Sequence, residues 1–233
     1  MKPIFLSIFS LTAFAQQPMP SPFAVSAGGG VYAAYSPSAT HMSGGGIASG
    51  IYTSGGTITG TATQTCNLAI TGGGSGATAT VALTGTNTIA GGTVLTITAA
   101  GTLYGTAPVA ATMSSGTATC SGSATISTVL TGITTTGSAY SQWGKNVFVV
   151  INVTGVSDGS APAISLPVQP LNQGTLLQTL ACAWSNDSGI WVGAVANPNV
   201  NATPALFIYQ YNQASPGANI SHSYACNGVY QSQ

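Results

Sequence analysis

The sequence predicts an all-β protein, with a small Gly/Thr-rich β-domain followed by a C-terminal antiparallel β-sandwich. Short runs of alternating apolar and polar residues recur along the chain, and Gly-rich breaks separate them. Thr and Val dominate these runs, and both residue types suit a half-buried pleated surface. No stretch of useful length has the period of about 3.6 residues that marks an amphipathic helix.

Residues 1–15 have the pattern of a secretory signal peptide. Lys2 supplies the positive charge, a short apolar stretch follows, and Ala13-Phe14-Ala15 is a small-x-small cleavage site. A buried N-terminal strand is the alternative interpretation. The apolar stretch is shorter than the roughly 20 residues of a membrane-spanning helix, and no later run reaches that length. We therefore expect an exported protein with no integral membrane segment.

Residues 16–60 are rich in Gly, Ser and Pro and are predicted to form an arm. Its Pro-rich start indicates a linker. Aromatic and branched residues such as Tyr32, Tyr35 and Ile51 stand between its glycine clusters, so short strands and turns are compatible with the remainder.

Residues 61–131 are predicted to form the small β-domain, because strand-like runs end at Gly-rich breaks. The segment has few large side chains, so its core must be thin. The predicted strands are 66–70, 77–83, 94–97, 117–120 and 124–130.

Residues 138–233 are predicted to form the C-terminal β-sandwich, after a hinge at 132–137. This part is more aromatic and more strongly alternating than the preceding domain. The predicted strands are 146–153, 163–166, 176–184, 189–195, 205–211 and 223–226.

The four cysteines are Cys66, Cys120, Cys182 and Cys226. An even count behind a signal peptide is typical of two disulfides formed in an oxidising compartment. Three pairings are compatible with the sequence; pairing neighbours keeps each bridge within one predicted domain and would contribute roughly 4 kcal/mol per bridge. Zinc is the alternative, but no cysteine pair has the close spacing of structural zinc ligands.

Charged side chains are almost absent. After the signal peptide only Lys145, Asp158 and Asp187 remain, and the chain has no Arg and no Glu. This composition argues against nucleic acid and against anionic membranes, which require clustered Lys or Arg. A soluble monomer normally keeps its net charge away from zero. A neutral surface therefore indicates a protein that packs into an assembly or is displayed on a particle.

The C-terminal pattern resembles the head domains at the tips of bacteriophage tail fibres. Tyr140–Val147 leads into a long strand, and Ile164-Ser165-Leu166-Pro167 closes the next one. The segment Gly72–Ala79 is similar to β-repeats of phage tail and surface proteins. The resemblance implies a homotrimeric fibre tip that binds a bacterial surface glycan or protein. Tail fibres are assembled in the host cytosol without signal peptides and rarely with disulfides, so these two predicted features favour a related module exported by a bacterium.

Catalytic chemistry has few candidates. Asp158 and Asp187 both lie in turn-like contexts, Ser157-Asp158-Gly159 and Asn186-Asp187-Ser188-Gly189. His41 and His222 are predicted to be polar surface residues. No Gly-x-Ser-x-Gly elbow and no phosphate-binding loop is present. We expect no enzymatic activity, no cofactor and no metal.

Aromatic residues remain as candidates for ligand binding, and most lie in the C-terminal domain. Trp and Tyr can stack on sugars or anchor a protein partner, although core packing is the alternative role. The candidates for ligand binding are Trp184, Trp191, Tyr209 and Tyr211, and Trp143 and Tyr224 belong to the same group. The expected function is that of a structural and adhesive surface protein that binds a cell-surface receptor or glycan and self-associates, for example as a homotrimer. A secreted carbohydrate-binding module and a surface-layer or filament subunit are the alternatives.

Overall fold

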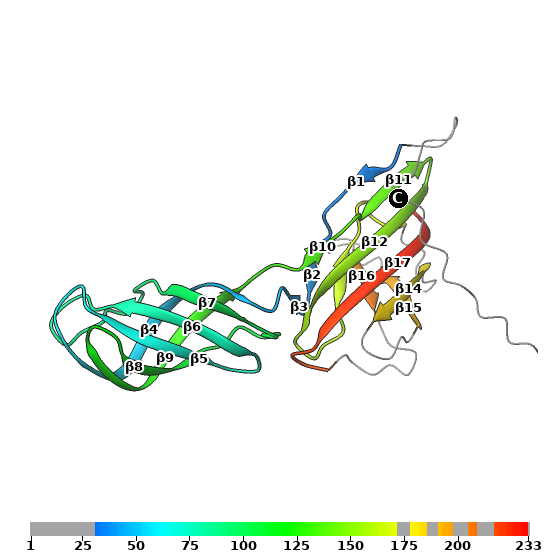
Figure 1. Ribbon diagram of the computed structural model, residues 1–233. Helices are drawn as coiled ribbons and strands as arrows, with labels where there is room; N and C mark the ends of the chain where they lie inside the picture. Colours follow the sequence, from blue (N-terminus) through cyan, green and yellow to red (C-terminus); the bar gives the residue numbers. More distant parts are fainter. Residues whose placement is uncertain (1–30, 172–177, 186–190, 198–204, 209–216, 233) are drawn as a thin grey trace, which may run out of the picture. The chain divides into compact units, whose positions relative to one another are not determined.

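The structure is a computed structural model that describes residues 31–171, 178–185, 191–197, 205–208 and 217–232. Strands account for 64% of the described residues and none of these residues is helical, so the protein is all-β, as predicted. Every strand pairing in this part of the chain is antiparallel. The strands form a six-stranded and an eleven-stranded sheet (Figure 1). The described residues contain no helix that could span a bilayer.

The six-stranded sheet has the order β4-β9-β8-β5-β6-β7 and curls on itself. The backbone nitrogen of Leu95 donates to Gly50 O at 2.9 Å and that of Tyr52 donates to Thr93 O at 2.8 Å. These bonds join the first strand to the segment that leads into the last. The strands are β4 (Ile47–Thr59), β5 (Thr65–Thr71), β6 (Ser75–Ala82), β7 (Thr96–Thr102), β8 (Ala110–Ser115) and β9 (Thr119–Leu130).

The interior of this sheet is built mainly from small and medium side chains, in line with the thin core expected from the sequence. Leu68, Val81 and Ile126 are almost fully buried, and Tyr104 is a fully buried aromatic side chain. The predicted strand 124–130 and the last two residues of the predicted strand 117–120 belong to one continuous strand, β9. Strand β8 was missing from the prediction, because its Ala- and Ser-rich sequence carries little hydrophobic alternation.

The eleven-stranded sheet has the order β1-β11-β12-β17-β14-β15-β16-β13-β2, and β10 and β3 also pair with β12. Strand β12 pairs with β17 along one edge and with three short strands along the other. The strands are β1 (Ala33–Ala34), β2 (Ala39–Thr40), β3 (Met42–Ser43), β10 (Thr134–Thr135), β11 (Ala139–Trp143), β12 (Asn146–Ser157), β13 (Ala163–Ser165), β14 (Gln178–Ser185), β15 (Trp191–Asn197), β16 (Ala205–Ile208) and β17 (Ser221–Gln231).

Alternation along β12 and β17 defines the core of the larger sheet. Val147, Val149, Ile151 and Val153 are buried, whereas the residues between them are half-buried or exposed. On β17 the buried positions include Tyr224, Cys226 and Tyr230. Since successive side chains of a strand point to opposite faces, these two strands present one apolar face inward.

The N-terminal part of the chain contributes more strands than its composition indicates. Strand β4 lies entirely within the predicted arm and pairs along β9, and β1 to β3 join the eleven-stranded sheet. The predicted hinge contains β10, which pairs with β12. Local periodicity could not reveal these pairings, because their partners lie far away in the sequence. The predicted signal peptide, residues 1–15, lies outside the described residues.

Candidate functional site

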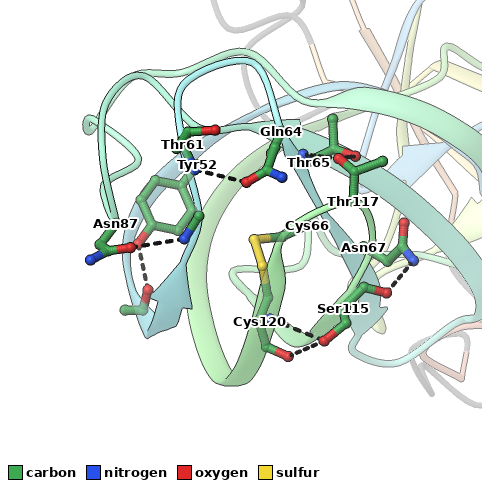
Figure 2. The surroundings of a disulfide bond; sticks show 12 residues. Tyr52, Thr61, Gln64, Thr65, Cys66, Asn67, Asn87, Ser115, Thr117 and Cys120 are labelled. Carbon is green, nitrogen blue, oxygen red and sulfur yellow. Dashed lines mark hydrogen bonds between the residues drawn. A yellow bond between two sulfur atoms is a disulfide. The ribbon is translucent and has the colours of Figure 1, made fainter.

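The Cys66–Cys120 disulfide links β5 to β9 with a Cα–Cα distance of 5.7 Å (Figure 2). Both cysteines are buried in the core of the six-stranded sheet. Ser115 Oγ accepts from the Cys120 nitrogen at 3.1 Å, and Asn67 Nδ2 donates to Ser115 O at 2.9 Å. Hydrogen bonds on both sides therefore hold the bridge between its strands.

The second disulfide joins Cys182 of β14 to Cys226 of β17, directly opposite each other in the sheet. Their Cα atoms are 4.0 Å apart, and both residues are almost fully buried. The structure thus pairs neighbouring cysteines, which was one of three arrangements compatible with the sequence. Because all four thiols are used in disulfides, no cysteine is left for zinc.

The four aromatic residues predicted to bind a ligand fall largely outside the described part of the chain. Trp184 is on β14, opposite Tyr224, and Trp191 is on β15, opposite Ala183, but the side chains of both lie outside the described residues. Tyr209 and Tyr211 lie outside the described residues altogether. Tyr224, named with this group, is 3% exposed and belongs to the core, where burial raises the pKa of its hydroxyl.

Trp143 is the most exposed aromatic side chain of the described residues, with 77% of its surface accessible. It ends β11, at the tip of the hairpin that Gly144 and Lys145 make between β11 and β12 (Figure 1). Gly144 has a φ of +59°, a left-handed conformation that glycine adopts without strain and that such a tight turn requires. An exposed indole keeps its flat apolar ring accessible to a partner, which makes Trp143 a candidate binding residue.

Strand register places further side chains on the same face as Trp143. Trp143 is opposite Asn146, and Asn146 is opposite Gln231. Two residues further along β12, Phe148 is opposite Val229. Directly opposed residues project to the same side of a sheet, and so do residues two apart on one strand. We call these five residues the Trp143 face: an exposed indole, a half-buried phenyl ring and a 46% exposed valine beside two exposed amides.

The tip of this hairpin is tied to the end of β17. Gln142 Nε2 donates to Gly144 O at 3.0 Å and to Ser232 Oγ at 3.1 Å. The Ser232 backbone nitrogen donates to Lys145 O at 2.7 Å. These bonds fix the turn in place, so that Trp143 would lose little conformational freedom of the backbone on binding a partner.

The prediction that His222 is a surface residue was wrong. Its side chain is 1% exposed, because it follows the inward alternation of Tyr224 and Cys226 along β17. Burial lowers the pKa of His222, and a backbone hydrogen bond with Gly217 acts in the opposite direction. A histidine held neutral in the core is not placed to serve a ligand at the surface.

His41 is exposed, as predicted, but it pairs with Asp158. His41 Nδ1 lies 2.9 Å from Asp158 Oδ2, and the other carboxylate oxygen accepts from the Ser160 nitrogen at 2.8 Å. The turn expected at Ser157-Asp158-Gly159 is present, with Gly159 at a φ of +98°. The partners are 117 residues apart, and no sequence pattern connects them. Asp187 lies outside the described residues.

No cluster of three or more His, Cys, Asp or Glu side chains suited to a metal ion occurs among the described residues. The one ion pair described, His41–Asp158, joins two turn residues rather than facing a second carboxylate or a nucleophile.

No protein-family model, curated protein or solved structure matches this chain. Its geometry must therefore carry any functional argument.

Proposed function

We propose that this protein is a non-enzymatic, structural and adhesive surface protein, extracellular or borne on a virion, that resembles a phage tail-fibre tip and binds a cell-surface receptor or glycan. It would also self-associate, for instance as a homotrimer, so that several copies bind one surface together. The observation that carries this proposal is the 77% exposed Trp143 at the tip of a hydrogen-bonded hairpin.

The Trp143 face suits recognition of an uncharged partner. The flat indole offers a stacking surface, and the amides of Asn146 and Gln231 offer both donors and acceptors. Phe148 and Val229 extend its apolar part. Aromatic side chains surrounded by polar groups are typical of interface positions that contribute most to binding.

Binding of the purified protein to a panel of intact bacterial strains tests this proposal. Trp143→Ala should abolish or strongly weaken binding to any strain that the wild type binds. Val94→Ala is the matched control, because Val94 is 70% exposed in the segment before β7, where it bridges Ile51 of β4. Equal binding by wild type and Trp143→Ala would remove Trp143 from the function, and no binding to any strain would contradict the adhesive role.

A bacterial secreted carbohydrate-binding module is the second candidate. Two buried disulfides are compatible with an extracellular protein, which favours export over assembly in the cytosol. The mass and thiol content of the protein from its natural source distinguish the two. A processed N-terminus near Gln16 with no free thiol supports the secreted module, whereas an intact Met1 with four free thiols supports the virion protein.

A further inference from the structure

Three short strands stand out because of where they come in the sequence. Strands β1, β2 and β3 precede the six-stranded sheet, yet they pair with β11, β13 and β12 of the eleven-stranded sheet. Residues 134–231 therefore do not complete their own sheet. Residues 33–43, which we call the seam segment, complete that sheet. In the sequence, the six-stranded sheet lies between the seam segment and residues 134–231.

The seam segment closes the larger sheet. On one side of His41, Ala39 and Thr40 pair with β13; on the other, Met42 and Ser43 pair with the end of β12. His41 turns the corner with a φ of +61°. Without this segment, β13 and the end of β12 would each present unpaired backbone groups, and such edges accept a strand from another chain.

The segment also covers part of the core. Tyr35, Ala39 and Met42 pack against the buried cluster of the larger sheet, and Tyr35 meets Tyr140 edge to face, with their ring centres 5.9 Å apart. Its polar contacts are specific as well. The Ser38 nitrogen donates to Ser165 Oγ and the Ser165 nitrogen donates to Ser38 O, both at 2.8 Å. Its sequence is thus matched to one site, the gap between β12 and β13.

The connection between the seam segment and β4 is short and tight. Only Gly44, Gly45 and Gly46 separate β3 from β4. The Gly44 nitrogen donates to Thr131 O at 2.7 Å, and a Cβ on Gly44 would lie 2.3 Å from Gly132 O. Short constrained hinges of this kind favour exchange of the attached segment between copies.

We propose that the seam segment also pairs in trans, so that residues 33–43 of one copy close the eleven-stranded sheet of a second copy. The partner is this same chain. The seam segment fits the eleven-stranded sheet of a second copy fully, because the contacts it would make there are the same as those it makes within one copy. Charge does not oppose the encounter, because Lys145 and Asp158 are the charged residues of the described part of the chain, and Asp158 pairs with His41 of the segment. Reciprocal exchange would give closed oligomers, and sequential exchange would give filaments.

Mixing two variants that each carry one added cysteine, with both native disulfides kept, tests exchange directly. Ala34 of β1 is opposite Ala139 of β11, so Ala34→Cys and Ala139→Cys on different molecules can meet in register only after exchange. The two full-length variants are mixed in mild denaturant, refolded together, oxidised with diamide and separated without reductant. We expect at least about tenfold more covalent heterodimer than in the control, because paired strands hold the two thiols at a high effective concentration.

The control replaces the second variant with Ala69→Cys, because Ala69 is an exposed position on β5 of the six-stranded sheet. This mixture measures chance collisions between thiols. A variant that carries both Ala34→Cys and Ala139→Cys shows, by its internal cross-link, that this pair of positions can be bridged. Heterodimer no more abundant than in the Ala69→Cys mixture would overturn the proposal.

This inference deepens the self-association part of the proposed function and does not involve the Trp143 face. The experiments can refute the adhesive function and the exchange mechanism independently of each other. A chain that binds cells through Trp143 but gives no exchanged heterodimer keeps its adhesive function and loses the exchange mechanism. A chain that exchanges but binds no cell keeps the mechanism and loses the adhesive function.

Discussion

His41 Nδ1 and Asp158 Oδ2 lie 2.9 Å apart and join the corner between β2 and β3 to the residue that follows β12. The Asp158 backbone nitrogen also donates to His41 O at 3.2 Å. His41 and Asp158 are thus joined by a side-chain contact and by a backbone hydrogen bond, at the point where the larger sheet closes. The position of this pair makes the stability of the closure sensitive to acid.

Asp158→Asn should reduce the loss of stability in strong acid. Burial acts to raise the pKa of Asp158, but hydrogen bonds from His41 and Ser160 and the charge of His41 together lower it. A carboxyl whose folded pKa lies below its unfolded value of about 3.9 stabilises above that pH, and this stabilisation is lost as the pH falls through the folded pKa. Urea unfolding of wild type and variant at about pH 7 and about pH 2.5 measures the difference. An equal loss of unfolding free energy in wild type and Asp158→Asn would contradict this prediction.

His222 should produce a second pH dependence at milder acidity. Burial lowers its pKa in the folded protein. The unfolded chain therefore binds a proton at higher pH, so stability is complete above about pH 6.5 and declines as the pH falls from there toward the folded pKa. The unfolding free energy of His222→Gln should vary less over this range, whatever its absolute value. His41→Gln is the control, and it should keep the wild-type slope that comes from His222.

Removing the Cys66–Cys120 bridge should destabilise the six-stranded sheet. The bridge closes a loop with a sequence separation of 54, so its loss through Cys66→Ala with Cys120→Ala should cost about 4 kcal/mol on the chain-entropy model. Chemical denaturation of the double variant measures this cost. The matched double variant Cys182→Ala with Cys226→Ala removes a bridge of separation 44 and should lose a similar amount. An unchanged denaturation midpoint would refute a stabilising role.

Tyr35→Phe should stabilise the protein by about 1 kcal/mol. Tyr35 Oη is buried and has no hydrogen-bond partner among the described residues, and burial raises its pKa. Removing a buried unsatisfied hydroxyl while keeping the ring against Tyr140 relieves its desolvation cost. The control is Tyr104→Phe, because Tyr104 Oη donates to Ile70 O at 3.2 Å. Thermal unfolding should move in opposite directions for the two variants.

Trp143→Ala should leave stability within about 0.5 kcal/mol of wild type, because its side chain is largely exposed. Ile151→Ala, which empties a fully buried site on the neighbouring strand β12, should cost about 3 kcal/mol. Equilibrium unfolding separates these outcomes. A large loss for Trp143→Ala would mean that the indole supports the fold, and any binding defect of that variant would then have a structural cause.

The all-β class and most strand positions could be predicted because alternation is a local property. The run 146–153 lies within β12, and 66–70 lies within β5, since a strand with one buried face repeats every second residue. Strand β8 escaped prediction because its Ala- and Ser-rich sequence hardly alternates. The sequence also indicated disulfides but left three pairings open. The adhesive interpretation depends on the resemblance to fibre tips, the neutral composition and the aromatic content, and aromatic content does not tell a core residue from a surface residue.

Composition and periodicity alone therefore determined a nearly uncharged, strand-rich chain with an even set of cysteines. Tertiary structure decided which cysteines pair, that His222 is buried, that Trp143 is exposed and that His41 meets Asp158. It also placed β1 to β3 in the eleven-stranded sheet. These outcomes depend on strand register and on the closure of sheets, which hydrogen bonds between distant segments establish. A local pattern cannot specify them, because the partner of each edge lies up to 127 residues away.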